Sequence, residues 1–185
     1  MNRLTKLLIF ALLGLSACDT GTQPGQDSNT VTLLFTNDVE SAYDPIPAFW
    51  LDDQEMIGGI AEMTSLINEL RRTEPNVFLF DSGDIFTGAL AKLTEGRLAF
   101  ELMITMGYDA MAIGNHEFDF GPDVLADFIS GINGAFPFVS ANLDMSGEPA
   151  LQALVDSGTI VNSTVVDVEG QQVGVVGATT PGLPF

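Results

Sequence analysis

The sequence predicts an α/β fold in which strands and helices alternate along the chain and pack in layers. Apolar, strand-like runs alternate with segments whose apolar residues have helical spacing. Polar turns directly follow three of these runs, and open α/β sheets place ligands at such strand ends. A strand–helix alternation of this kind favours a sheet covered by helices. The strand-like runs are 31–35, 77–80, 110–113 and 136–142.

Each segment between two of these runs predicts a helix. In the first segment apolar residues recur three or four positions apart, at Ile60, Met63, Ile67 and Leu70. The second ends before Gly107, and the third begins with Pro122, a residue favoured in the first turn of a helix. These three helices are expected over 58–72, 98–106 and 122–129. Farther along, two β-rich runs on either side of Gly170 predict a hairpin, over 164–168 and 171–176.

The N-terminus has the features of a signal peptide. Arg3 and Lys6 precede an apolar stretch that is too short to span a bilayer, and small residues follow it. The stretch ends in Leu-Ser-Ala-Cys18, which resembles a bacterial lipoprotein box, so we expect residues 1–17 to be removed and Cys18 to be lipidated. The alternative is an ordinary secretory signal in which the cysteine is coincidental.

The predicted leader divides the chain into three parts. After residues 1–17, residues 18–30 lack hydrophobic periodicity and are rich in Gly, Gln, Ser and Asn, which predicts a flexible tether. The folded part is expected over 31–185. These boundaries imply a protein exported across the inner membrane and held by its lipid at the cell envelope. They do not distinguish the inner from the outer membrane.

Acidic residues dominate the charge of the chain. The formal net charge is −19, and removal of the leader would leave four basic residues against twenty-five acidic ones, about −21. Nucleic acid and anionic lipid are therefore poor electrostatic partners, and membrane contact is expected through the lipid alone. Bound divalent cations would neutralise part of this charge, although surplus acids also serve simply to keep a surface soluble.

Candidate ligands for such cations follow the three strand-like runs. Asp38 and Glu40 follow the first run, Asp84 follows the second, and Asn115 follows the third. Carboxylate and amide oxygens suit hard divalent cations, so we expect these four side chains to converge on one cavity. His116, the only histidine of the chain, directly follows Asn115. A lone histidine is often structural, but this one lies in a loop beside carboxylates, which favours catalysis.

The order Asp-x-Glu, Gly-Asp and Gly-Asn-His-Glu resembles the calcineurin-like metallophosphoesterases. Within them, the run Asn-His-Glu-Phe-Asp-Phe-Gly from Asn115 to Gly121 looks like the secreted 5′-nucleotidase branch. This resemblance implies a layered α/β/β/α metallophosphoesterase sandwich, here truncated after about the fifth or sixth strand. The part present would be the N-terminal part of the catalytic domain, without the C-terminal substrate domain.

The resemblance also implies roles for the residues that match the motif. Asp38 and residue 40 would hold a first divalent metal ion, Asp84 would bridge to a second, and Asn115 would bind the second. His116 would stabilise the transferring phosphoryl group and the leaving oxygen, with Asp119 orienting its ring. Hydroxide on the metal would attack phosphorus, because paired ions stabilise the attacking and leaving oxygens of an in-line displacement. The expected substrate is a small phosphate ester, and the resemblance to 5′-nucleotidases implies a nucleotide.

Two departures from the family pattern qualify this interpretation. The family has histidine where this chain has Glu40, and an oxygen ligand shifts the preference from Zn²⁺ toward Mn²⁺ or Mg²⁺ unless the carboxylate is wrongly aimed and disables the first site. No histidine follows His116, so the second ion lacks the family's downstream ligands. We therefore expect the chain itself to be poorly active. The competing hypothesis is a non-catalytic lipoprotein that binds a cation or a partner without turnover.

Overall fold

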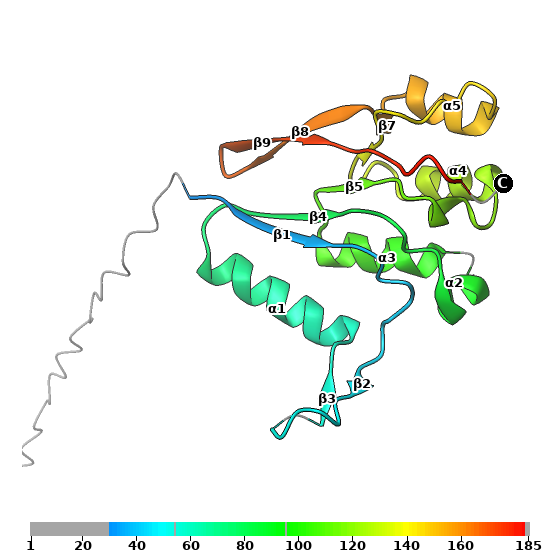
Figure 1. Cartoon of the computed structure of the whole chain (residues 1–185). Coiled ribbons are helices and arrows are strands. Elements are labelled where there is room, and N and C mark those ends of the chain that lie inside the picture. The colour runs from blue at the N-terminus through cyan, green and yellow to red at the C-terminus, as the bar shows by residue number, and fades with distance from the viewer. Residues whose placement is uncertain (1–29, 54, 95, 184–185) are drawn as a thin grey trace, which may run out of the picture.

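The computed structural model describes residues 30–53, 55–94 and 96–183, and its centre is a five-stranded parallel sheet (Figure 1). The strands lie in the order β1-β4-β5-β6-β7, and every neighbouring pair is parallel. This confirms the predicted layered α/β class. The strands are β1 (Thr32–Thr36), β4 (Val77–Asp81), β5 (Ala110–Ala112), β6 (Phe138–Val139) and β7 (Ile160–Val161).

Helices connect these strands and cover one face of the sheet. Because the strands are neighbours in sequence order and parallel crossovers are right-handed, successive helices fall on the same side. The main core joins residues of α1, α3, α4 and α5 to Leu79, Met111, Phe138 and Ile160 of the sheet. The helices are α1 (Ile60–Thr73), α2 (Gly88–Thr94), α3 (Arg97–Met106), α4 (Pro122–Gly131) and α5 (Pro149–Asp156), with a short 3₁₀ turn η1 (His116–Phe118).

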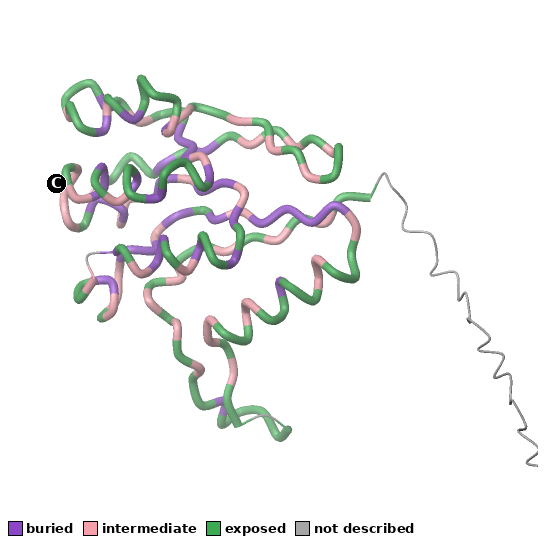
Figure 2. The backbone as a smooth tube through the Cα atoms, turned by 180° about the vertical axis from the view of Figure 1, so that it is seen from behind, coloured by how far each residue is buried: buried purple, intermediate pink, exposed green. Residues whose placement is uncertain are grey.

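Burial alternates along β1, the edge strand, whereas the adjacent β4 is buried over most of its length (Figure 2). Side chains alternate along a strand, and Leu34 of β1 packs against the helix-side core. Its neighbours Leu33 and Phe35 therefore point to the other face, where they are 54% and 73% exposed. On the same face Phe78 of the adjacent β4, which pairs with Leu33, is fully buried. The exposed apolar strip on this face, formed by Leu33 and Phe35, thus lies on β1 at the edge of the sheet.

Four further strands form two small antiparallel pairs. The predicted hairpin is confirmed as β8 (Ser163–Val168) and β9 (Gln171–Val176). The sequence did not predict the pair β2 (Ile46–Pro47) and β3 (Met56–Ile57), nor β7, because a two-residue strand has no detectable periodicity. It also missed α2 and α5, which are short helices.

The predicted leader, the lipidation site Cys18 and all of the predicted tether (residues 18–30) except Thr30 lie outside the described residues. Among the residues that are described, none of the helices combines the length and the apolar character needed to cross a bilayer.

Candidate active site

The three candidate loops lie side by side because their strands are adjacent. Asp38 follows β1, Asp84 follows β4 and Asn115 follows β5, at the carboxyl ends of parallel neighbours. The Asp38 amide donates to the Gly83 carbonyl over 3.1 Å, which joins the first two loops directly. Asp38 and Asp84 both have positive φ angles, 50° and 64°, a conformation that is uncommon outside glycine and concentrates at functional sites.

The second and third loops approach each other at backbone distance. A Cβ atom on Gly83 would lie 2.5 Å from the Gly114 nitrogen, and one on Gly114 would lie 2.3 Å from Asp84 Oδ1. Only glycine permits this packing. The approach also allows the His116 amide to donate to Asp84 Oδ1 over 2.9 Å. The backbone of the candidate catalytic histidine is therefore tied to a candidate metal ligand.

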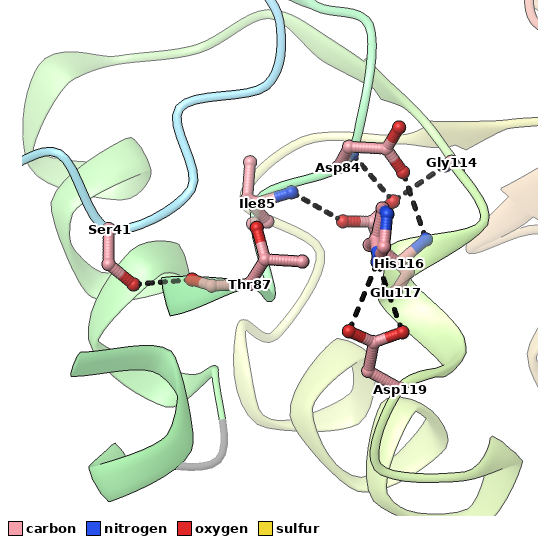
Figure 3. A network of polar contacts seen from close by, with 8 residues as sticks. All are labelled: Ser41, Asp84, Ile85, Thr87, Gly114, His116, Glu117 and Asp119. Atoms are coloured by element: carbon pink, nitrogen blue, oxygen red, sulfur yellow. Dashed lines mark hydrogen bonds and ion pairs between the residues drawn. The ribbon is translucent and has the colours of Figure 1, made fainter. Parts of the chain in front are cut away.

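Glu117 fills the space between the same two loops (Figure 3). Its side chain is fully buried, and its carboxylate accepts three backbone hydrogen bonds. Burial raises the pKa of Glu117 to about 7, although the three donors pull it down. No role for this residue was predicted from the sequence. The available clue was its position directly after His116, within the polar motif that follows β5.

The ring of His116 is oriented by Asp119, as expected from the sequence motif (Figure 3). Nδ1 lies 3.1 Å from each carboxylate oxygen of Asp119, one helical turn farther along. This hydrogen bond is the largest cause that raises the pKa of His116; burial opposes it, and the charges of Asp119, Asp84 and Glu40 add smaller increases. The ring is thus biased toward the protonated form, with Nε2 left as the proton donor.

A second buried carboxylate, Asp81, closes β4 behind the site. Thr36 donates to it over 2.5 Å, and the Gly83 amide donates over 2.8 Å. Burial raises the pKa of Asp81 to about 6, partly offset by these two bonds and reinforced by the charges of Asp38 and Asp84. Tyr108 shares a hydrogen bond with Thr36 over 2.7 Å. This network fixes the ends of β1 and β4, from which the first two loops start.

The loop that carries Glu40 is docked on the start of α2. Ser41 donates to the Thr87 carbonyl over 2.6 Å and accepts from the Ala91 amide over 2.9 Å. A Cβ atom on Gly88 would lie 2.3 Å from the Glu40 carbonyl oxygen. Glu40 itself has a φ of 47° and an exposed side chain. Its backbone is therefore held, while its carboxylate is solvent-accessible.

The side chains of the candidate ligands do not form a completed metal site. We expected oxygens of Asp38, Glu40 and Asp84 to converge on one point, but within the described residues no three His, Cys, Asp or Glu side chains are grouped to hold an ion. Like charges repel, and two of the carboxylates accept other hydrogen bonds: Asp38 from Asn37 and Asp84 from His116. The fold thus brings the loops together without bringing the three carboxylates into ligand geometry.

The donor types nevertheless fit a hard divalent cation. The described part of the chain shows no ion pair to Asp38, Glu40 or Asp84, so their charges are neutralised by no described Lys or Arg. Asp38 and Glu40 are exposed and Asp84 is half-buried, which leaves all three accessible to an ion. Carboxylate oxygens and the Asn115 amide are ligands that Mg²⁺ and Mn²⁺ accept.

A fourth strand end supports the site from β6. Thr179 is buried and donates to the Ile113 carbonyl over 2.5 Å, while its hydroxyl lies 2.9 Å from that of Ser140. Asn142 bonds both the amide and the carbonyl of Thr179. The segment after β9 is therefore fastened to the loops that follow β5 and β6. Thr179 could not be found from the sequence, because nothing in the residues around it distinguishes it.

Adjacent loops at the carboxyl ends of a parallel sheet, with carboxylates, an amide and an oriented histidine, define a hydrolase-like α/β site. Residues 31–175 match the calcineurin-like phosphoesterase family. A 5′-nucleotidase of Mus musculus is 36% identical over 166 residues, which cover 88% of this chain and 28% of that protein. The chain belongs to the calcineurin-like phosphoesterase family.

Other relatives agree with this assignment. The trifunctional nucleotide phosphoesterase protein YfkN of Bacillus subtilis is 35% identical over 175 residues, covering 81% of this chain and 11% of that protein. The crystal structure of a 5′-nucleotidase precursor from Thermus thermophilus superposes with a TM-score of 0.73 at 38% identity, covering 82% of this chain and 29% of that one. The chain thus spans less than a third of the length of each of these relatives.

Proposed function

We propose that this chain carries part of the active site of a metal-dependent phosphoester hydrolase, and that the protein acts as a 5′-nucleotidase on small nucleotides. The observation that carries this proposal is the junction of His116 with Asp84. Its amide bonds Asp84, a candidate metal ligand, while its ring bonds Asp119. A proton donor is thereby held beside the residue that would bridge two ions.

In this proposal Asp38 and Glu40 would hold one ion, Asp84 would bridge, and Asn115 would hold the other. The ions would supply an activated water and neutralise charge on the phosphoryl oxygens. Two divalent ions would also neutralise part of the negative charge of the carboxylates at this edge of the sheet. Because Glu40 offers an oxygen ligand, we propose Mn²⁺ or Mg²⁺ rather than Zn²⁺.

His116 would donate its Nε2 proton toward the leaving oxygen of the ester. Its raised pKa keeps that proton available near neutral pH, and Asp119 holds the ring by its other nitrogen. Asp84 would accept the His116 amide throughout, which fixes the distance between ring and ions. Gly83 and Gly114 permit this packing, because neither position has room for a Cβ atom.

The proposed substrate class and location rest on the similar proteins rather than on the described geometry of the site. Several similar proteins are 5′-nucleotidases, and one is a snake venom 5′-nucleotidase. Together with the predicted leader and Cys18, this supports a nucleotide substrate and action outside the cytoplasm at a lipid-anchored position.

The test is phosphate release with Mn²⁺ from a nucleoside monophosphate and from a chromogenic phosphodiester. We expect low but measurable turnover of the monophosphate by this chain, lost in both His116→Ala and Asp84→Asn. Glu101→Gln, an exposed change on α3, should leave the rate unchanged. Absence of turnover in the unmodified chain and in any longer form of the protein would favour the non-catalytic hypothesis instead.

A further inference from the structure

We propose that Glu117 is a positioning residue that sets the geometry of Asp84 and Asn115 by clamping their two loops together. The proposal rests on the proposed function, because it concerns the same metal-binding edge of the sheet. The described partners of the Glu117 carboxylate are three backbone amides. Glu117 would act through the loops that carry the ligands.

The clamp consists of three backbone donors that converge on one carboxylate. Oε2 accepts from the Asp84 amide over 2.9 Å and from the Gly114 amide over 2.6 Å. Oε1 accepts from the Ile85 amide over 2.8 Å. The Asp84 and Ile85 amides belong to the loop after β4, and the Gly114 amide belongs to the loop after β5. A single side chain therefore connects two strand ends.

These bonds act where the backbone is strained and closely packed. Asp84 has a φ of 64°, and Gly114 packs against it without room for a Cβ atom. A residue in this conformation persists only where its surroundings hold it. Three strong hydrogen bonds to a buried carboxylate supply that restraint, because charge-assisted bonds are about twice as strong as neutral ones. Release of the clamp would free Asp84 to leave the position beside His116.

The clamp requires a carboxylate rather than any polar side chain. The three backbone amides donate to both oxygens of Glu117. A glutamine has only one acceptor oxygen, and its other terminal group is an NH₂ donor. Whichever way the glutamine amide turns, at least one backbone N–H would face another donor. Glu117→Gln therefore keeps the shape of the side chain and removes part of the clamp.

The decisive measurement is calorimetric titration of the full chain with MnCl₂, alongside its thermal unfolding without metal. We expect Glu117→Gln to weaken Mn²⁺ binding by about 10- to 100-fold at temperatures where it is fully folded. Two controls accompany it. Glu101→Gln should change neither quantity, and Ile129→Ala, a buried change in α4, should lower the melting temperature while leaving Mn²⁺ affinity unchanged.

The possible results separate the two proposals. Loss of affinity in Glu117→Gln but not in Ile129→Ala supports the clamp. Unchanged affinity in a folded Glu117→Gln overturns the clamp and leaves the proposed function standing. No Mn²⁺ binding by the unmodified chain overturns the clamp as a device for metal binding, and the same result with any longer form of the protein overturns the proposed function.

A second measurement applies if Glu117→Gln does not fold. Asp84, Ile85 and Gly114 lie in no helix or strand, so slow hydrogen exchange of their amides would report the bonds to Glu117. We expect all three amides of the unmodified, metal-free chain to exchange far more slowly than the same amides in the urea-unfolded chain. Exchange of all three at unprotected rates would overturn the clamp.

Discussion

His116 is held at two points by two different carboxylates. Its ring bonds Asp119 and its amide bonds Asp84, so the candidate proton donor is tied to a candidate metal ligand. The raised pKa of His116 has Asp119 as its largest cause. A histidine stabilised in this way has a pH-dependent effect on folding, since the protonated form gains more from the folded state.

Replacement of Asp119 by asparagine should therefore lower the pKa of His116 toward its ordinary value of 6.5. Because the folded pKa is the raised one, the stabilisation that Asp119 provides is fully present below the unfolded pKa and disappears as pH rises through the folded pKa. Asp119→Asn should thus destabilise the metal-free chain more on the acidic side of pH 6.5 than on the alkaline side.

Both effects can be measured directly. The ring protons of the only histidine in the chain give a single NMR titration curve, and urea unfolding at acidic and alkaline pH reports the stability difference. Asp123→Asn, an exposed change on α4, is the control and should move neither. An unchanged titration midpoint in Asp119→Asn would refute the assigned cause of the shift.

At the scale of elements, the site depends on loops that are fastened to one another rather than on rigid helices. Glu117 joins the loops after β4 and β5, Ser41 joins the loop after β1 to α2, and Thr179 joins the segment after β9 to β5 and β6. Buried hydrogen bonds of this kind are costly to break, because the partner left behind is desolvated and unpaired.

We expect Thr179→Val to lower the free energy of unfolding by roughly 1–3 kcal/mol, since it leaves the Ile113 carbonyl without its side-chain donor and deprives Ser140 of a partner. Valine has nearly the shape of threonine, so packing changes little. Urea unfolding measures the loss. Thr105→Val, which removes only an exposed bond to Glu101 within α3, should cost clearly less, and an equal cost in both would contradict the fastening role.

At the scale of the whole molecule, one edge of the sheet remains apolar and uncovered by any described residue. Leu33, Phe35 and, on α1, Leu66 are more than half exposed. They line a groove along the outer side of β1 together with Leu70 and Met63. Exposed apolar edge strands promote association, because unpaired backbone groups and apolar side chains are presented together.

Phe35→Lys should therefore reduce self-association of the chain without affecting its fold. Phe35 is 73% exposed, so the change removes apolar surface and adds charge at the edge strand. Sedimentation velocity over a range of concentrations measures the effect, with Leu93→Lys as a matched change at a 79% exposed leucine on α2. Equal association of the unmodified chain and Phe35→Lys would show that this strip is not the cause.

By itself the sequence determined the α/β class, the main strand-and-helix alternation and the three polar loops, because apolar periodicity and motif order are local properties. The tertiary structure decided which loops are neighbours, since the order β1-β4-β5 is set by crossovers that no local pattern contains. It also decided the role of Glu117, whose three donors come from residues 3 to 33 positions away along the chain. Likewise, Thr179 acquires its partners only when distant segments pack, because buried hydrogen bonds join residues by proximity in space and not in sequence.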